Sequence, residues 1–203
     1  TRKESSAASD VYKRQRLYRI TTFGESHSSN VGVTIENFPP KFNLDLEKIQ
    51  KQLDRRRPGQ SSISTPRNEF DKFEIITGME NNLTLGTMIT ALVKNKNIKP
   101  EDYKWKQEYV PRPSHADYTY LSKYGIHASS GGGRSSARET IGRVIAGAAA
   151  EQWLKENFNI DIVAWVDSVG EISTSYYEPN ISRSNVYVNI IRCLDKDVGE
   201  KMI

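Results

Sequence analysis

The sequence predicts an α+β fold, in which helices pack on antiparallel strands. Short apolar runs bounded by Gly, Pro and Asn occur in pairs joined by polar turns, which is typical of strands. Other segments carry apolar residues at the spacing of an amphipathic helix. Strands and helices do not alternate strictly along the chain, as a doubly wound parallel sheet would require. The 203 residues are enough for one domain.

The first half of the chain is expected to hold one helix and four strands. The helix is predicted at Asp45–Arg55, where apolar residues recur at i, i+3 and i+7. Asn43 or Asp45 caps it, and Pro58-Gly59 ends it. The strands are predicted at Leu17–Thr22, Val31–Ile35, Lys72–Thr77 and Thr87–Val93.

The second half is dominated by a long predicted helix, Arg134–Phe158, which contains no proline. The Ala and Gly residues at 146–150 indicate that this helix packs closely against another backbone. The other predicted elements are a helix at Ser114–Lys123 capped by Ser114, strands at Ile160–Val169 and Val186–Arg192, and a helix beginning at Asp195–Ile203.

Composition excludes several classes of protein. The single cysteine, Cys193, cannot form an intramolecular disulfide, which excludes a disulfide-stapled scaffold. No stretch approaches the roughly 18 to 20 apolar residues of a membrane-spanning helix, so no membrane partner is expected. A cytoplasmic location is expected because no secretory signal is visible. The net charge of +4 is compatible with binding phosphorylated small molecules or nucleic acid, but it is also ordinary for a protein with no anionic ligand.

Residues 1–16 are small, polar and charged, without helical or strand periodicity. We expect them to be a disordered or extraneous lead-in, and residues 17–203 to belong to a single domain. Mean hydropathy is −0.64, which is low for a packed domain of this size. Either much of the chain is surface, or part of a larger core is missing.

Two histidine segments could carry proton chemistry. His27 follows Gly24-Glu25-Ser26 in a turn between two predicted strands, where it could act as a general acid. His115 is expected at the first position of a helix, beside Asp117; a helix N-terminus disfavours positive charge, and the chemical interpretation is a histidine near an anion. The alternatives are a turn histidine bonded only to backbone and a helix-capping arrangement.

Two arginine segments could bind anions. Arg55, Arg56 and Arg57 end a predicted helix, and their planar forks suit phosphate or carboxylate. A solvated basic helix end or a nucleic-acid patch remains open on charge alone.

The glycine run Gly131-Gly132-Gly133 leads into a helix on which Arg134 and Arg138 would share a face. Ser135 and Ser136 add hydroxyl donors. The spacing is neither that of a P-loop nor that of a dinucleotide fingerprint, and the alternative is a linker into a capped helix. No metal-ligand spacing occurs, so no metal is implied.

Together these strings resemble the chorismate synthase family. The resemblance runs from about Leu17 to the end of the chain. It rests on four strings: Thr21 to His27, Arg55 to Ser61, Ser114 to Gly125 and Gly131 to Thr140. Ala128-Ser129-Ser130 resembles the fungal and protozoan branch, which includes enzymes that reduce their own flavin with NADPH.

The resemblance implies an anti-1,4-elimination. 5-Enolpyruvylshikimate 3-phosphate would lose its phosphate and a ring hydrogen to give chorismate, the last step of the shikimate pathway. Reduced FMN would supply electron density transiently as the phosphate leaves.

Roles follow for the matched positions. The resemblance implies that His27 protonates the departing phosphate and that His115 protonates or hydrogen-bonds the reduced flavin. Arg56 lies where the family contacts substrate phosphate or the nicotinamide cofactor. The expected substrate-binding residues are Arg55, Arg56, Arg57 and Arg138. The expected FMN-binding residues are Arg134, Ser135, Ser136 and His115.

The family continues well past Ile203, and its members form tetramers in which helices are sandwiched between two antiparallel sheets. This chain is therefore expected to be the N-terminal portion of such an enzyme, with the sandwich incomplete and the isolated portion inactive. One alternative is a truncated, non-catalytic fragment or pseudoenzyme that keeps only an anion-binding surface. Another is a basic nucleic-acid-binding module, whose binding would fall steeply with salt.

Overall fold

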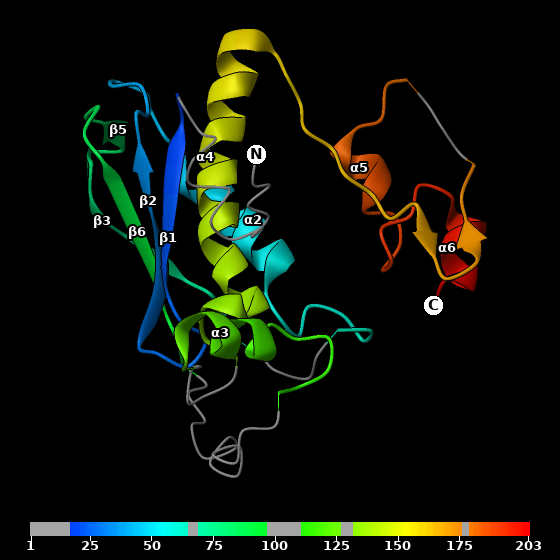
Figure 1. The fold of residues 1–203 in the computed structure, drawn as a ribbon. Helices are drawn as coiled ribbons and strands as arrows, with labels where there is room; N and C mark the ends of the chain where they lie inside the picture. The colour runs from blue at the N-terminus through cyan, green and yellow to red at the C-terminus, as the bar shows by residue number, and fades with distance from the viewer. Residues whose placement is uncertain (1–16, 65–68, 97–110, 127–131, 176–178) are drawn as a thin grey trace, which may run out of the picture.

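The computed structural model describes residues 17–64, 69–96, 111–126, 132–175 and 179–203. At its centre lies a four-stranded antiparallel sheet with the strand order β1-β2-β6-β3 (Figure 1). The strands are β1 (Arg19–Gly24), β2 (Asn30–Glu36), β3 (Phe73–Thr77) and β6 (Ile89–Lys94). All four strands predicted in the first half are present, with ends shifted by no more than two residues.

Two helices, α2 (Leu46–Arg56) and α4 (Thr140–Phe158), cover one face of this sheet (Figure 1). Alternate residues of a strand point to the same face, so the buried positions of β2 and β6 form one apolar layer. The fully buried side chains of this layer and of the two helices include Val31, Val33, Ile35, Ile89, Ala91, Val93, Ile49, Leu53, Ile141 and Ile145. Asp45 caps α2 by accepting a hydrogen bond from the backbone N of Lys48, 3.1 Å away.

Helix α4 lies close to the sheet at Gly142. A Cβ at this position would lie 2.9 Å from the carbonyl oxygen of Gly32 and 2.9 Å from Cγ2 of Thr22. One turn later the Tyr18 hydroxyl donates to the carbonyl of Ala146 over 2.7 Å, and burial raises the pKa of that phenol above its ordinary value. Gly147, by contrast, has nothing within 4 Å of where a Cβ would lie.

Gly142→Ala is expected to lower the free energy of unfolding by about 1 to 3 kcal/mol, because the methyl group meets backbone that cannot easily move. Gly147→Ala on the same helix is the matched control, and should raise it by about 0.5 to 1 kcal/mol through helix propensity. Urea unfolding of both variants measures the difference. Equal effects at the two positions would show that α4 does not approach the sheet closely.

The remaining elements include two short hairpins, formed by β4 (Met79–Glu80) with β5 (Leu83–Thr84) and by β7 (Ser168–Val169) with β8 (Ile172–Ser173). Three further helices are α3 (Asp117–Tyr124), α5 (Arg183–Val186) and α6 (Lys196–Lys201). The segment from β7 to α6 lies to the side of α2 and α4, away from the sheet (Figure 1). No helix among the described residues is long and apolar enough to cross a membrane.

Two strands predicted near the C-terminus are corrected by the structure. Only Ser168–Val169 of the predicted strand at 160–169 is paired, and the predicted strand at 186–192 is wrong because residues 187–191 form turns and a bend. An apolar run becomes a strand only where a partner strand accepts its hydrogen bonds. For these two runs the described residues offer little more than the short β7–β8 pairing and a backbone hydrogen bond from N of Val166 to the carbonyl of Arg192, and Ile162 and Val188 stay more than half exposed. The side chain of Asn189 instead closes a turn through both backbone groups of Cys193.

Candidate functional site

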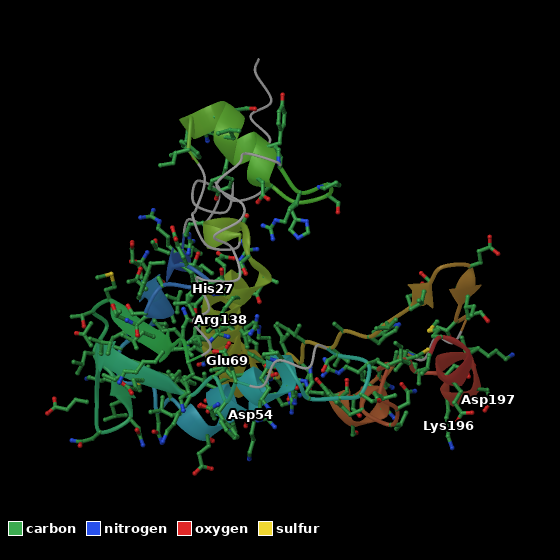
Figure 2. All side chains as sticks on the ribbon, turned by 90° about the horizontal axis from the view of Figure 1, so that it is seen from below. His27, Asp54, Glu69, Arg138, Lys196 and Asp197 are labelled. Atoms are coloured by element: carbon green, nitrogen blue, oxygen red, sulfur yellow. The ribbon has the colours of Figure 1, made fainter. Side chains whose placement is uncertain are left out.

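His27 lies half-buried in the turn between β1 and β2 (Figure 2). The turn begins at Gly24, whose φ of 82° favours glycine. Inside it the Ser28 hydroxyl accepts from the backbone N of Glu25 over 3.0 Å and donates to the carbonyl of Asn30 over 2.8 Å. The backbone around His27 is thus held by its own hydrogen bonds.

Arg134 holds the strand end from which this turn leaves. Its Nη1 donates to the carbonyl of Gly24 over 2.8 Å, and its Nη2 donates to the carbonyl and the hydroxyl of Thr22 over 3.0 and 2.8 Å. Glu139 lies 3.6 Å from the same Nη2. The predicted flavin-binding guanidinium therefore points at β1, and its role toward FMN stays a prediction.

Arg138 lies in a buried ionic network and is only 4% exposed. Its Nη2 is 2.8 Å from Oε2 of Glu69, its Nη1 is 3.0 Å from Oδ1 of Asp71, and its Nε donates to Oδ1 of Asn95. Figure 2 places Arg138 between the labelled His27 and Glu69. These contacts lend no support to Arg138 as a substrate ligand, which stays a prediction.

Arg56 joins the same network from the end of α2. Its Nη1 lies 3.1 Å from Oδ2 of Asp71, its Nε donates to the Thr140 hydroxyl, and its Nη2 donates to the carbonyl of Ala137. Burial lowers the pKa of the Arg56 guanidinium; Arg138 lowers it further and Asp71 opposes the shift. Asp71 thus bridges two guanidiniums, and with Glu69 it leaves the network neutral.

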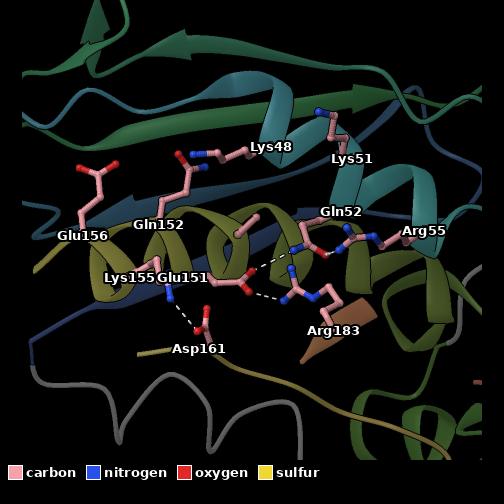
Figure 3. Close-up of a pocket in the computed structure, with 11 residues that line it drawn as sticks. Lys48, Lys51, Gln52, Arg55, Glu151, Gln152, Lys155, Glu156, Asp161 and Arg183 are labelled. Carbon is pink, nitrogen blue, oxygen red and sulfur yellow. Dashed lines mark hydrogen bonds and ion pairs between the residues drawn. The ribbon is translucent and has the colours of Figure 1, made fainter. Parts of the chain in front are cut away.

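The three consecutive arginines do not converge on one site. Arg55 lines a separate cavity of about 200 Å³ between α2 and α4, where it donates to Gln52 over 2.9 Å and packs over the ring of Tyr187 (Figure 3). Arg57 packs over the ring of Phe70. Successive residues of a helix point about 100° apart, so only Arg56 reaches the network that contains Arg138. Substrate binding by Arg55 and Arg57 stays a prediction.

Four of the charged side chains that line this cavity form ion pairs with one another. Glu151 forms an ion pair with Arg183, and Lys155 lies 2.7 Å from Asp161 (Figure 3). Arg183 also donates to the carbonyl of Ile162. Residues that follow α4 in the chain therefore pack at this cavity beside α2 and α4.

The glycine run does not lead straight into an α-helix. Two 3₁₀ turns, η2 (Gly133–Ser135) and η3 (Ala137–Glu139), precede α4, with Ser136 in an extended conformation between them. The Ser136 hydroxyl accepts from the backbone N of Arg138 and caps the second turn. The prediction that Arg134 and Arg138 share a helix face is therefore wrong: one holds β1, the other is buried beside Glu69.

His115 lies outside helix α3 and is exposed. The prediction that Ser114 caps this helix and that His115 is its first residue is wrong, because Ser114 has a φ of 58° and Ala116 is the N-cap. Nδ1 of His115 lies 3.0 Å from the carbonyl oxygen of Pro113. No described contact joins His115 to His27, and its role toward the flavin stays a prediction.

The start of α3 is held by Asp117 and Arg112. The guanidinium donates to both carboxylate oxygens over 2.7 and 2.9 Å. The side-chain hydrogen bonds from Arg112 lower the pKa of Asp117 from 3.8 to about 2.

Because this pKa is lower in the folded state, the Arg112–Asp117 pair should stabilise the fold above about pH 4, and the contribution should be lost as the pH falls to about 2. A carboxyl-carbon NMR titration is expected to give a midpoint near 2 for Asp117. Arg112→Met should return that midpoint toward the ordinary value, whereas a wild-type midpoint already at the ordinary value would contradict the assignment.

Sequence reasoning missed four residues of this region: Ser26, Glu69, Asp71 and Asn95. Ser26 is 3% exposed, and its hydroxyl has no hydrogen-bond partner among the described residues. The buried carboxylates lie in a loop before β3 with no motif-like spacing, so only the three-dimensional contacts reveal them. Within the described ranges no group of three or more His, Cys, Asp or Glu side chains could hold a metal ion. The string Ala128-Ser129-Ser130 and Gly131, the first residue of the glycine run, lie outside the described residues.

Comparison with known proteins gives one consistent family. Residues 18–203 match the family model described as chorismate synthase. Curated chorismate synthases from Prochlorococcus marinus strains MIT 9301 and MIT 9515 are 54% and 53% identical over 188 residues, and one from Synechococcus sp. strain WH7803 is 52% identical over 187 residues. The alignments cover 92 to 93% of this chain and 51% of each relative.

The chain thus spans about half the length of the curated relatives it matches. These relatives are cyanobacterial, so the likeness to the fungal and protozoan branch stays a prediction. A solved structure described as a crystal structure of chorismate synthase aligns with a TM-score of 0.58 and 30% identity, over 78% of this chain and 40% of that chain. It supports the α+β fold class. The chain belongs to the chorismate synthase family.

Proposed function

We propose that this chain is the N-terminal portion of an enzyme that eliminates phosphate from 5-enolpyruvylshikimate 3-phosphate to give chorismate. The observation that carries the proposal is the arrangement around His27 in a member of this family. A half-buried imidazole lies in a turn that Arg134 holds at its β1 end, next to a network that contains Arg56 and Arg138. Such a site joins a proton donor to fixed positive groups.

His27 is the proposed general acid. A departing phosphate dianion needs a proton and positive charge at its leaving oxygen, and an imidazole can supply the proton near neutral pH. Arg56 is the proposed anion contact, because it is the less buried of the two guanidiniums bridged by Asp71, with its side chain 20% exposed. The Ser26 hydroxyl, which is adjacent to His27 and has no hydrogen-bond partner in the part of the chain that the structure describes, is a further proposed donor to the substrate.

Reduced FMN would supply electron density to the substrate as the phosphate leaves. The described residues fit such a group in part. Ser135 is exposed, with its hydroxyl donating only to the nearby carbonyl of Gly132 over 2.6 Å, and could turn to a ligand. His115 is exposed as well, whereas the side chains of Arg134 and Ser136 are already engaged in hydrogen bonds to the backbone. Ser135 and His115 are therefore the proposed flavin contacts of this chain.

The proposed activity is that of a complete protein, of which this chain forms one part. Relatives are about twice as long as this chain, so the rest of the site and the assembly into a tetramer are proposed to need further sequence. Residues 1–203 alone are then proposed to be inactive and to bind FMN poorly. NADPH is the proposed reductant if the protein reduces its own flavin.

The test is an anaerobic assay of the complete protein with 5-enolpyruvylshikimate 3-phosphate. Chorismate and inorganic phosphate should form in equal amounts with reduced FMN, and neither should form without flavin. Phosphate release without chorismate would indicate a phosphatase and contradict the proposal. Turnover by residues 1–203 alone would show that the portion is complete for catalysis. Binding of FMN without any turnover by the complete protein would favour the pseudoenzyme alternative.

A further inference from the structure

We infer that Asn95 is a positioning residue that fixes the turn carrying His27, and that Arg138 influences the reaction through Asn95. The inference rests on the proposed role of His27. Asn95 directly follows β6 and is 7% exposed, so its contacts are made away from solvent. None of the motifs in the sequence contains it.

Asn95 holds the turn on both sides of His27. Its Nδ2 donates to the carbonyl oxygens of Glu25 and Ser28 over 2.9 and 2.6 Å, and its backbone N donates to the carbonyl of Ser29 over 2.9 Å. Because these carbonyls precede and follow residue 27, the three bonds set the direction in which the imidazole leaves the backbone.

Arg138 determines which way the Asn95 amide faces. The carbonyls of the turn can only accept hydrogen bonds, and a guanidinium can only donate them. The amide nitrogen must therefore face the turn while Oδ1 accepts from Nε of Arg138. Arg138 is itself fixed by its ion pairs with Glu69 and Asp71. The buried carboxylates thus connect to His27 through one guanidinium and one amide.

Arg138 can influence the reaction through Asn95 even though it is buried. A guanidinium that is 4% exposed and engaged by two carboxylates and an amide offers little surface to a substrate. Buried ion pairs and hydrogen bonds of this kind restrict the motion of the side chains that form them, and a rigid turn keeps a catalytic group within the narrow range of positions that proton transfer requires.

The test is a double-mutant cycle between Asn95→Asp and His27→Ala in the complete protein. Asn95→Asp keeps the acceptor that faces Arg138 and removes both amide donors to the turn. Alone it should lower kcat about 100-fold with the substrate KM little changed, because a misplaced catalytic group costs about that much. In the His27→Ala background it should change kcat by less than about twofold, because the group it positions is gone.

Gln152 offers a matched control. It is also 7% exposed, and its amide bridges the backbone N and the carbonyl of Asp45 over 2.9 and 3.0 Å, at the start of α2. Gln152→Glu removes the same kind of buried amide donor far from His27. It should lower the midpoint of thermal unfolding and leave kcat unchanged.

Two results would overturn the inference. One is an unchanged kcat in Asn95→Asp, and the other is an equal loss with and without His27, which would show that Asn95 acts independently of that residue. In both cases a slow His27→Ala variant would leave the proposed function standing. An active His27→Ala variant would instead remove the proposed acid. If Asn95→Asp does not fold, Asn95→Ser replaces it in the cycle under the same criteria.

Discussion

His27→Ala in the complete protein is expected to lower the turnover of 5-enolpyruvylshikimate 3-phosphate by about 10² to 10⁴-fold, the usual contribution of a general acid. The variant lacks the group proposed to protonate the departing phosphate, while Arg134 and Asn95 still hold the turn through backbone carbonyls that alanine leaves in place. Anaerobic chorismate formation with reduced FMN measures the loss. Flavin fluorescence titration checks that FMN binding is retained.

Ser29→Ala is the control for His27→Ala, since Ser29 is an exposed residue of the same turn. Its turnover should stay within about twofold of wild type, as for most surface substitutions. Unchanged turnover in His27→Ala, with flavin binding intact, would remove this histidine from the mechanism.

Asp71→Asn is expected to lower the free energy of unfolding by about 3 to 5 kcal/mol, because it leaves the partly buried guanidinium of Arg56 and the buried one of Arg138 with one carboxylate. Asp71 is fully buried, and it pairs with Arg56 and Arg138 at 3.1 and 3.0 Å. Its φ is 45°, a region that asparagine also tolerates, so the substitution tests the charge without adding backbone strain. Urea unfolding measures the change.

The matched control is Glu74→Gln, three residues further along the chain in strand β3, where Glu74 and Lys94 form an exposed ion pair. An ion pair whose side chains are 51% and 66% exposed should contribute no more than about 1 kcal/mol. Equal effects of Asp71→Asn and Glu74→Gln would mean that burial does not strengthen the Asp71 pairs.

Local sequence patterns predicted the strands of the sheet and its two helices because the apolar residues of each element recur at a regular spacing within a short stretch of the chain. The spacing of Leu46, Ile49 and Leu53 located α2, and Asp45 caps it. The same approach failed after α4, where apolar residues 160–169 and 186–192 look like strands but find almost no pairing among the described residues. Strand formation depends on a partner that the local sequence does not contain.

Within the candidate site, the sequence indicated only the residues that stand in motifs. His27 and Arg56 stand in recognisable strings, but Arg134 and Arg138 diverge because Ser136 interrupts the helix that would have aligned them. The contacts that position His27 join residues far apart in the chain: Asn95 reaches Glu25, and Arg138 reaches both Asn95 and Glu69. No periodicity or motif connects such residues, so these partners could not be predicted.

A crystal structure of the complete protein with 5-enolpyruvylshikimate 3-phosphate bound would locate the substrate relative to the proposed acid and anion contact. We expect the substrate phosphate to lie within hydrogen-bond distance of both His27 and Arg56. A phosphate seated instead in the cavity between α2 and α4, against Lys48, Lys51 and Arg55, would contradict it.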